Sequence, residues 1–209
     1  MDANFARESI DQELRRRHLA QRLVAHQART HTVFRLTGLS RHQQATMRRR
    51  WQVTTEMRRR GPLPKSFAAF FSTQRTRDEA AVLALLWRLF SSVAPSSSPA
   101  RAPGRVEIGE CFCDVFEAHL ACFRGGTLEL DHLLLLSRGL DEAVAVSLAR
   151  CSGGCEAVML ADLLGPPRRR CSRCQHAESV SPLSAVVRKN WIVASGLASL
   201  CNCGMILAC

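Results

Sequence analysis

Four cysteines in two close pairs, within CSGGCEAVMLADLLGPPRRRCSRC at residues 151–174, constrain the fold of this chain more than any other feature. The first pair has the spacing C-x3-C and the second C-x2-C, and fifteen residues separate the pairs. A short loop between two cysteines lets both thiolates reach one ion, and structural zinc takes four such ligands in a tetrahedron. The pattern predicts a zinc site with the ligands Cys151, Cys155, Cys171 and Cys174.

The first residues bear on whether these cysteines are reduced. The segment MDANFARESIDQELRRRHLA is charged throughout and has no apolar run or small-residue cleavage site of a signal peptide. We therefore expect a cytoplasmic protein, in which thiols stay reduced and paired cysteines bind metal more often than they form disulfides. The alternatives are disulfides and a chance cluster in a chain with ten cysteines.

Residues around the pairs bear on the kind of site. Gly153 and Gly154 favour zinc, because they allow the positive backbone angles of a tight loop. His176 is an alternative ligand close to the second pair, but a lone histidine in this place is more often a surface residue. Four protein ligands leave no open position, so we expect one structural zinc ion per chain. The sequence has no H-E-x-x-H, no Ser-His-Asp set and no H-x-E ahead of the cysteine pairs, and we expect no enzymatic activity.

Positive charge is concentrated in the first third of the chain. Residues 1–65 contain fifteen Lys or Arg and five Asp or Glu, a net charge of +10, whereas the net charge of the whole chain is +11. Such a concentration of positive charge indicates a polyanionic partner, and we expect nucleic acid rather than an acidic membrane. A solvated helical face is the alternative, but such a face normally mixes both signs of charge.

Within this third, HTVFRLTGLSRHQQATMRRRWQ has the layout of a helix-turn-helix around residues 31–60. We expect a short helix over 31–37 with Val33, Phe34 and Leu36 on its apolar side. A turn at Gly38 follows, and a second helix starts at Ser40, where Gln43 completes a capping box. A helical hairpin in an ordinary bundle has the same pattern.

The second helix is the predicted recognition helix, and Pro62 ends it by Gly61. The residues expected to face inward are Ala45, Met47 and Trp51. The side chains expected to face outward in the first turn and to reach base edges are Arg41, His42 and Gln44. The side chains expected to contact phosphates are Arg48, Arg49, Arg58, Arg59 and Arg60.

The rest of the chain is predicted to be mainly α-helical. We expect helices over 78–90, 110–123 and 128–150, with a flexible linker of Ser, Pro and Ala at 91–104. Three further cysteines lie in the apolar helical stretch CFCDVFEAHLACF and are expected to be packing residues: Cys111, Cys113 and Cys122.

The chain resembles the flagellar transcriptional activator FlhC family over about residues 10–176. The similar segments are LTGLSRHQQATMRRRW, GPLPKSFAAFF, the helix ending in SLARC and the paired cysteines. The resemblance implies a mainly helical bacterial protein that pairs with an FlhD-type subunit in a hetero-oligomer. It also implies binding to double-stranded flagellar promoter DNA and recruitment of RNA polymerase. By this resemblance, the four paired cysteines are the zinc ligands and the helix from Arg41 faces DNA.

These inferences divide the chain into four regions. We expect a basic helical DNA-binding region at 1–65, a helical core and partner-binding region at 66–150, a four-cysteine zinc region at 151–176 and an apolar tail at 177–209. Residues 191–209 carry no charged side chain, but few of them are strongly apolar. We therefore favour a packed or disordered tail over a membrane anchor.

Two functions remain open at this point. The favoured one is a DNA-binding transcriptional activator subunit. The alternative is a zinc-stabilised assembly or adaptor protein that binds nucleic acid without reading its sequence.

Overall fold

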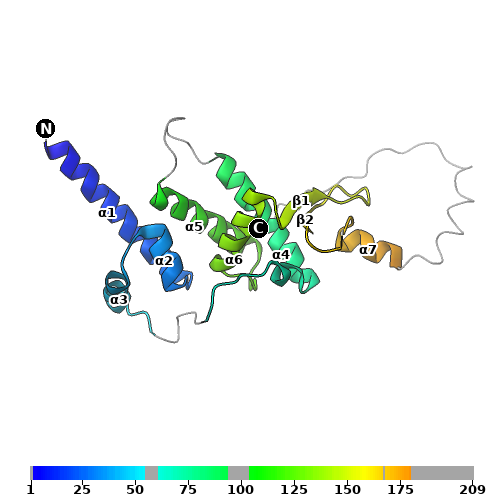
Figure 1. Ribbon diagram of the computed structural model, residues 1–209, viewed down its shortest axis with the longest axis horizontal. Coiled ribbons are helices and arrows are strands. Elements are labelled where there is room, and N and C mark those ends of the chain that lie inside the picture. The colour runs from blue at the N-terminus through cyan, green and yellow to red at the C-terminus, as the bar shows by residue number, and fades with distance from the viewer. Residues whose placement is uncertain (1, 55–60, 94–103, 167, 180–209) are drawn as a thin grey trace, which may run out of the picture.

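The described part of the protein is mainly helical, as predicted, with one small sheet. A computed structural model describes residues 2–54, 61–93, 104–166 and 168–179. The elements follow one another in this order (Figure 1): α1 (Asp2–Ala25), α2 (Thr30–Thr37), α3 (Arg41–Arg50), the 3-10 helix η1 (Phe67–Phe71), α4 (Gln74–Val93), α5 (Arg105–Cys122), α6 (Leu130–Glu142), β1 (Val146–Arg150), β2 (Val158–Asp162) and α7 (Ser172–Ser179).

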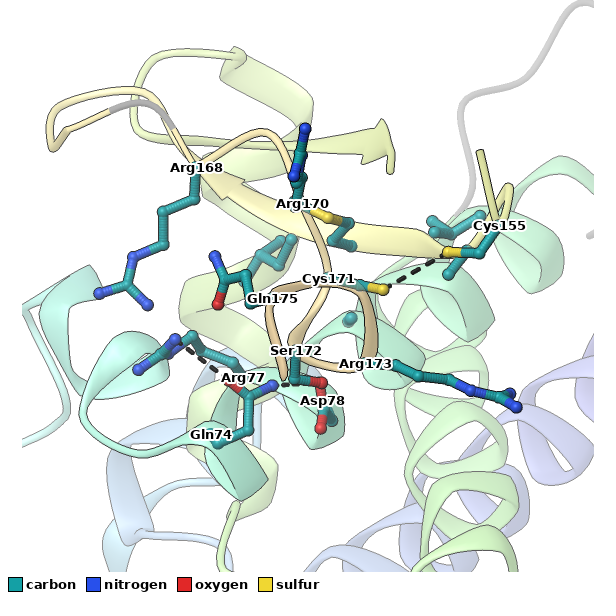
Figure 2. Close-up of a pocket in the computed structure, with 15 residues that line it drawn as sticks. Gln74, Arg77, Asp78, Cys155, Arg168, Arg170, Cys171, Ser172, Arg173 and Gln175 are labelled. Carbon is teal, nitrogen blue, oxygen red and sulfur yellow. Dashed lines mark hydrogen bonds between the residues drawn. The ribbon is translucent and has the colours of Figure 1, made fainter. Parts of the chain in front are cut away.

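A β-hairpin carries the cysteine region. Strands β1 and β2 pair antiparallel, with Val146 opposite Asp162 and Arg150 opposite Val158. The hairpin packs on α4, and α7 lies beside it (Figure 2). The prediction of a helix over 128–150 is therefore wrong at its end, because α6 stops at Glu142 and Ala143 takes the left-handed conformation, with φ 50°. The run AVAVSLAR after it contains the β-branched residues Val144 and Val146, which favour a strand.

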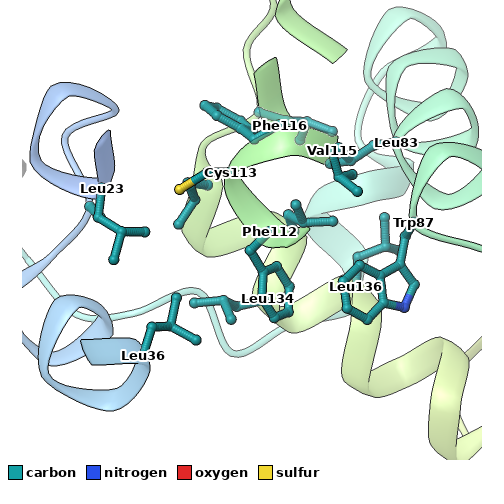
Figure 3. Packing of buried hydrophobic residues seen from close by; sticks show 14 of the residues in the cluster. Leu23, Leu36, Leu83, Trp87, Phe112, Cys113, Val115, Phe116, Leu134 and Leu136 are labelled. Atoms are coloured by element: carbon teal, nitrogen blue, oxygen red, sulfur yellow. The ribbon is translucent and has the colours of Figure 1, made fainter. Parts of the chain in front are cut away.

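One hydrophobic core joins the basic third to the middle of the chain. Helix α5 lies at its centre and packs against α1, α2, α4 and α6. Figure 3 shows Leu23 of α1 and Leu36 of α2 on one side of α5, and Leu83 and Trp87 of α4 on the other. Trp87 stacks on Phe112 of α5 with ring centroids 4.6 Å apart. The boundary predicted near residue 65 thus does not separate two cores.

Polar groups also tie the basic third to α6. Arg29 donates hydrogen bonds to Glu129, at 3.0 Å, and to the buried Asp131, at 2.5 Å. The hydroxyl of Thr32 donates to the same Asp131 carboxylate. A buried carboxylate is tolerated because a cation and a hydroxyl satisfy it. These bonds fix α2, and with it the turn into α3, against the helical core.

A second buried carboxylate organises the loop before α6. Glu79 of α4 is fully buried and accepts hydrogen bonds from the backbone N–H groups of Thr127, at 3.0 Å, and Leu128, at 2.9 Å. Its Oε1 also lies 3.4 Å from Nε2 of the fully buried His119. Burial acts to raise the pKa of Glu79, but these hydrogen bonds outweigh it and the pKa is lowered.

The remaining helix predictions are confirmed with extended bounds. Helix α4 contains the predicted 78–90, and α5 begins at Arg105 and ends one residue before the predicted 123. Most of the predicted linker, residues 94–103, lies outside the described residues. Cys113 is a buried thiol of α5, and burial raises its pKa to about 12, in keeping with the packing role expected of it.

Candidate metal centre and basic helix surface

Two loops bring the four paired cysteines together. Cys151 directly follows β1 and Cys155 lies in the turn that leads to β2, while Cys171 and Cys174 lie at the start of α7. The hairpin ladder continues into the first loop, since Cys151 N–H donates to the Ala157 carbonyl at 2.8 Å. Ser152 N–H donates to the Arg169 carbonyl at 2.7 Å and so joins the two loops.

The positions of the sulfur atoms fit a single metal ion. The four Sγ atoms all lie within 4.8 Å of one another, and those of Cys155 and Cys171 are 3.4 Å apart (Figure 2). Metal–sulfur bonds of about 2.3 Å in a regular tetrahedron place the sulfurs about 3.8 Å apart. The observed spacing brackets this value. No disulfide joins the cysteines that the structure describes. The four predicted ligands therefore form a site that could hold a metal ion.

The two glycines of the first loop serve different purposes. Gly154 has φ +80°, the left-handed angle predicted for a tight loop. Gly153 does not, and its role is space, because a Cβ there would lie 2.7 Å from Sγ of Cys174 and 3.3 Å from Sγ of Cys151. The prediction that both glycines supply positive angles is therefore correct for Gly154 alone. Gly153 is required because the side chain of Cys174 packs against it.

Two backbone N–H groups donate hydrogen bonds to the sulfur of Cys151 and so favour its metal-binding form. Cys171 N–H donates to Sγ of Cys151 at 3.2 Å, and Gly153 N–H donates to the same sulfur at 3.3 Å. These bonds, with the one from Cys171 the stronger influence, lower the pKa of Cys151 to about 6. The thiolate, which is the form that binds metal, is thereby favoured. The side chain of His176 and the cysteines of the tail (Cys201, Cys203 and Cys209) lie outside what the structure describes.

No family model matches this chain, and no curated protein matches it either.

The predicted start of α3 is confirmed. Ser40 is the N-cap: its hydroxyl accepts from Gln43 N–H at 3.3 Å, and the Gln43 side chain accepts from Ser40 N–H at 2.8 Å. Gly38, with φ 74°, makes the turn between α2 and α3. The helix begins at Arg41, so Arg41 and His42 occupy its first turn, and both are exposed.

Two of the predicted DNA contacts on α3 are wrong in orientation. Gln44 is 2% exposed and its Nε2 donates to the Leu39 carbonyl at 2.8 Å. Arg48 is 6% exposed, and its guanidinium donates to Thr30 Oγ1 at 2.9 Å. Neither side chain is presented to a partner. Ala45, predicted to face inward, is exposed.

The physical reason is the phase of the helix. The inner face of α3 consists of Gln44, Met47, Arg48 and Trp51, which follow the i, i+3, i+4, i+7 pattern. Two of these four residues are polar, so a search for apolar side chains alone places the face one position away. The carbonyls of Leu39 and Ala28, in the short segments that follow α2 and α1, accept the hydrogen bonds that make their burial tolerable.

The exposed basic residues of the helix pair are fewer than the sequence predicts. Exposed arginines near the turn are Arg35, Arg41, Arg49 and Arg50. Several other arginines pair with acids of α1, α5 and α6: Arg15 with Glu110, Arg16 and Arg17 with Glu13, Arg22 with Asp114 and Glu117, and Arg29 with Glu129 and Asp131. Much of the positive charge of residues 1–65 is therefore compensated within the fold. Arg58, Arg59 and Arg60 lie outside the described residues.

Within the described ranges, every helix is too short or too polar to cross a bilayer. The apolar tail at 191–209 lies outside these ranges.

Proposed function

We propose that this chain is a DNA-binding transcriptional activator subunit, similar to the FlhC subunit of the flagellar master regulator. The observation that carries the proposal is the geometry of α3: a capping box starts the helix after a glycine turn, and Arg41 and His42 are exposed in its first turn. This is where a recognition helix reads base edges in the major groove. Arg49 and Arg50 are exposed further along the helix, where phosphate contacts are expected.

We propose zinc as the metal of the four-cysteine centre. Four cysteine ligands at tetrahedral spacing are typical of structural zinc, and four protein ligands leave no position for substrate or activated water. The bound ion would cross-link the hairpin to α7 and contribute folding energy directly. In this proposal the chain is not an enzyme, and the centre is structural.

The proposed partners are double-stranded promoter DNA, an FlhD-type subunit and RNA polymerase, in the cytoplasm. Large apolar side chains on two helices support a protein partner. Ile10 and Leu14 of α1 are 60% and 58% exposed, and Leu85 and Leu89 of α4 are 45% and 55% exposed. Each pair lies on adjacent turns of its helix, and contiguous exposed apolar surface is typical of protein-interaction sites.

One observation favours the alternative, a zinc-stabilised adaptor with non-specific nucleic-acid binding. Burial of Gln44 removes one of the three expected base-reading side chains, which weakens the case for sequence reading, whereas Arg49 and Arg50 remain exposed for phosphate contacts.

The test is co-expression with an FlhD-type subunit, followed by binding to promoter and scrambled duplexes. We expect a soluble hetero-oligomer that prefers the promoter duplex, and R41Q and H42Q should each reduce this preference by about 1–3 kcal/mol. Equal binding to both duplexes would establish the adaptor function instead. A well-behaved monomer that ignores the partner subunit and binds neither duplex would reject both.

A further inference from the structure

A basic groove lies beside the metal centre, between the start of α4, β2 and the segment that leads into α7. Its volume is about 270 Å³. Figure 2 shows the polar side chains on its walls: Gln74 and Arg77 from α4, Arg168 from the loop after β2, and Arg173 and Gln175 from α7. Among the described residues that line the groove, Asp78 is the single acid, and Gln74 Nε2 donates to its Oδ1 at 2.8 Å.

Two guanidinium groups, one from each wall, approach each other at one end of this groove (Figure 2). Arg77 is half-buried and positioned by bonds from its Nε to the Phe71 carbonyl, at 3.3 Å, and from its Nη1 to Gln74 Oε1, at 3.2 Å. Arg168 points toward it from the opposite wall (Figure 2). Burial and then the positive charge of Arg168 lower the pKa of Arg77. The positive charges of Arg77 and Arg168 repel each other, and an anion bound between them would offset this repulsion.

Neutralisation of the cysteine thiolates does not account for this pair. In Figure 2 the guanidinium groups of Arg77 and Arg168 lie at one end of the groove, and Cys155 and Cys171 lie at the other end. Arg173 points away from the two guanidinium groups and toward the cysteine side of the view.

We propose that this groove binds a phosphate group of a nucleic-acid backbone, with Arg77 and Arg168 as its two cationic ligands. The planar fork of arginine matches the geometry of phosphate oxygens, and two forks on opposite walls enclose one anion. The side-chain amide of Gln175 points into the same space and can donate to an oxygen. The choice of nucleic acid rests on the proposed function.

This groove extends the nucleic-acid surface well beyond α3. Helices α3 and α7 lie toward opposite ends of the longest axis of the molecule (Figure 1). A nucleic acid that contacts both must run along this axis. The metal centre would then also support anion binding, because it fixes the loop that carries Arg168 and the helix that carries Gln175.

The experiment uses the zinc-loaded full-length chain and two probes, inorganic pyrophosphate and a duplex of random sequence. The variants are R168Q, the double variant R77Q/R168Q and the control R138Q, which removes the same charge from an exposed position on α6. Zinc content is measured for each, and R168Q, at an exposed position, remains informative if the double variant does not fold.

We expect wild-type protein and R138Q to bind pyrophosphate in calorimetry, and R77Q/R168Q to bind it at least about tenfold more weakly. On DNA, the slope of log affinity against log salt should fall by about one in R77Q/R168Q, which is the loss of one phosphate contact. Pyrophosphate affinity that is unchanged by R168Q and by the double variant would overturn the site. Loss of pyrophosphate binding with an unchanged DNA slope would overturn its assignment to nucleic acid.

The variant R41Q/R49Q separates this proposal from the function proposed for α3. It should weaken DNA binding and leave pyrophosphate binding at the wild-type level. If promoter preference is absent and pyrophosphate binding still depends on Arg168, the function proposed for α3 is wrong and the anion site in the groove is supported. If R41Q/R49Q abolishes pyrophosphate binding, the anion site is on α3 and the groove proposal is wrong.

Discussion

The metal centre and helix α3 both hold charged or ionisable side chains, but they position them by different means. At the metal centre, short loops, backbone N–H donors and one glycine contact fix the sulfurs over a span of 24 residues, from Cys151 to Cys174. On α3, orientation depends on contacts with distant segments, such as the bond from Arg48 to Thr30 on α2. Local geometry therefore defines the first site, and tertiary packing defines the second.

This difference has an energetic consequence. A metal at the four-cysteine centre joins two loops that have little apolar packing of their own, so its loss should unfold the region. Helix α3 is held by a few buried polar contacts and by the partly buried Met47 and Trp51. Single substitutions there should cost less and should separate stability from binding.

Replacing Cys174 by Ala should have the largest effect. We expect zinc content to fall from about one ion per chain to near zero and the protein to become insoluble or degraded, because structural zinc contributes about 10 kcal/mol or more to folding. Metal analysis and circular dichroism measure both changes. The control C122S removes a thiol from the end of α5, outside the cluster, and should keep the metal and the fold. Soluble, folded and metal-free C174A protein would show that the centre is not structural.

The pair R48Q and R49Q tests the assignment of the inner and outer faces of α3. Arg48 is buried with hydrogen bonds to Thr30 and to the Ala28 carbonyl, and R48Q should lower the free energy of unfolding by about 2 kcal/mol. Arg49 is exposed, and R49Q should change it by less than about 0.5 kcal/mol. Urea denaturation measures both. Equal losses of stability would mean that the face assignment is wrong.

Acidification should have a smaller effect, which comes from His119. Burial lowers the pKa of His119 below its usual 6.5, although the Glu79 carboxylate acts to raise it. Between the lowered folded pKa and 6.5, the His119 side chain therefore stays neutral in the folded protein but is protonated in the unfolded chain. Stability from this source is complete above pH 6.5 and is lost as the pH falls toward the lower folded pKa.

We expect the free energy of unfolding to fall by up to about 1.4 kcal/mol per pH unit over this range because of His119 alone. In H119L, which removes the titrating group but keeps an apolar side chain, the dependence on pH should be shallower by this amount. Urea denaturation at a series of pH values measures the slopes. An unchanged slope in H119L would show that another group is responsible.

Sequence reasoning succeeded where chemistry restricts the choice of residue. Four cysteines at close spacing have few uses in a reduced chain, and Ser40 with Gln43 is a local signal that needs no tertiary context. It failed where tertiary contacts decide. Gln44 and Arg48 are polar residues in a buried position, and their acceptors belong to segments up to 20 residues away. The strand Val146–Arg150 was predicted as helix because it directly follows an apolar helix in the sequence. The basic groove was not predicted because it combines residues of α4 with a loop more than 80 residues later.

The most direct test of DNA binding is affinity for promoter and scrambled duplexes across a salt series, for wild type, R41Q, R49Q and the control R138Q. We expect R49Q to reduce the salt slope by about one on both duplexes, as expected for a phosphate contact. R41Q should weaken binding by about 1–3 kcal/mol on the promoter duplex and much less on the scrambled one. R138Q should match wild type. If neither R41Q nor R49Q changes affinity for either duplex, the exposed face of α3 is a solvated surface and the DNA-binding proposal is wrong.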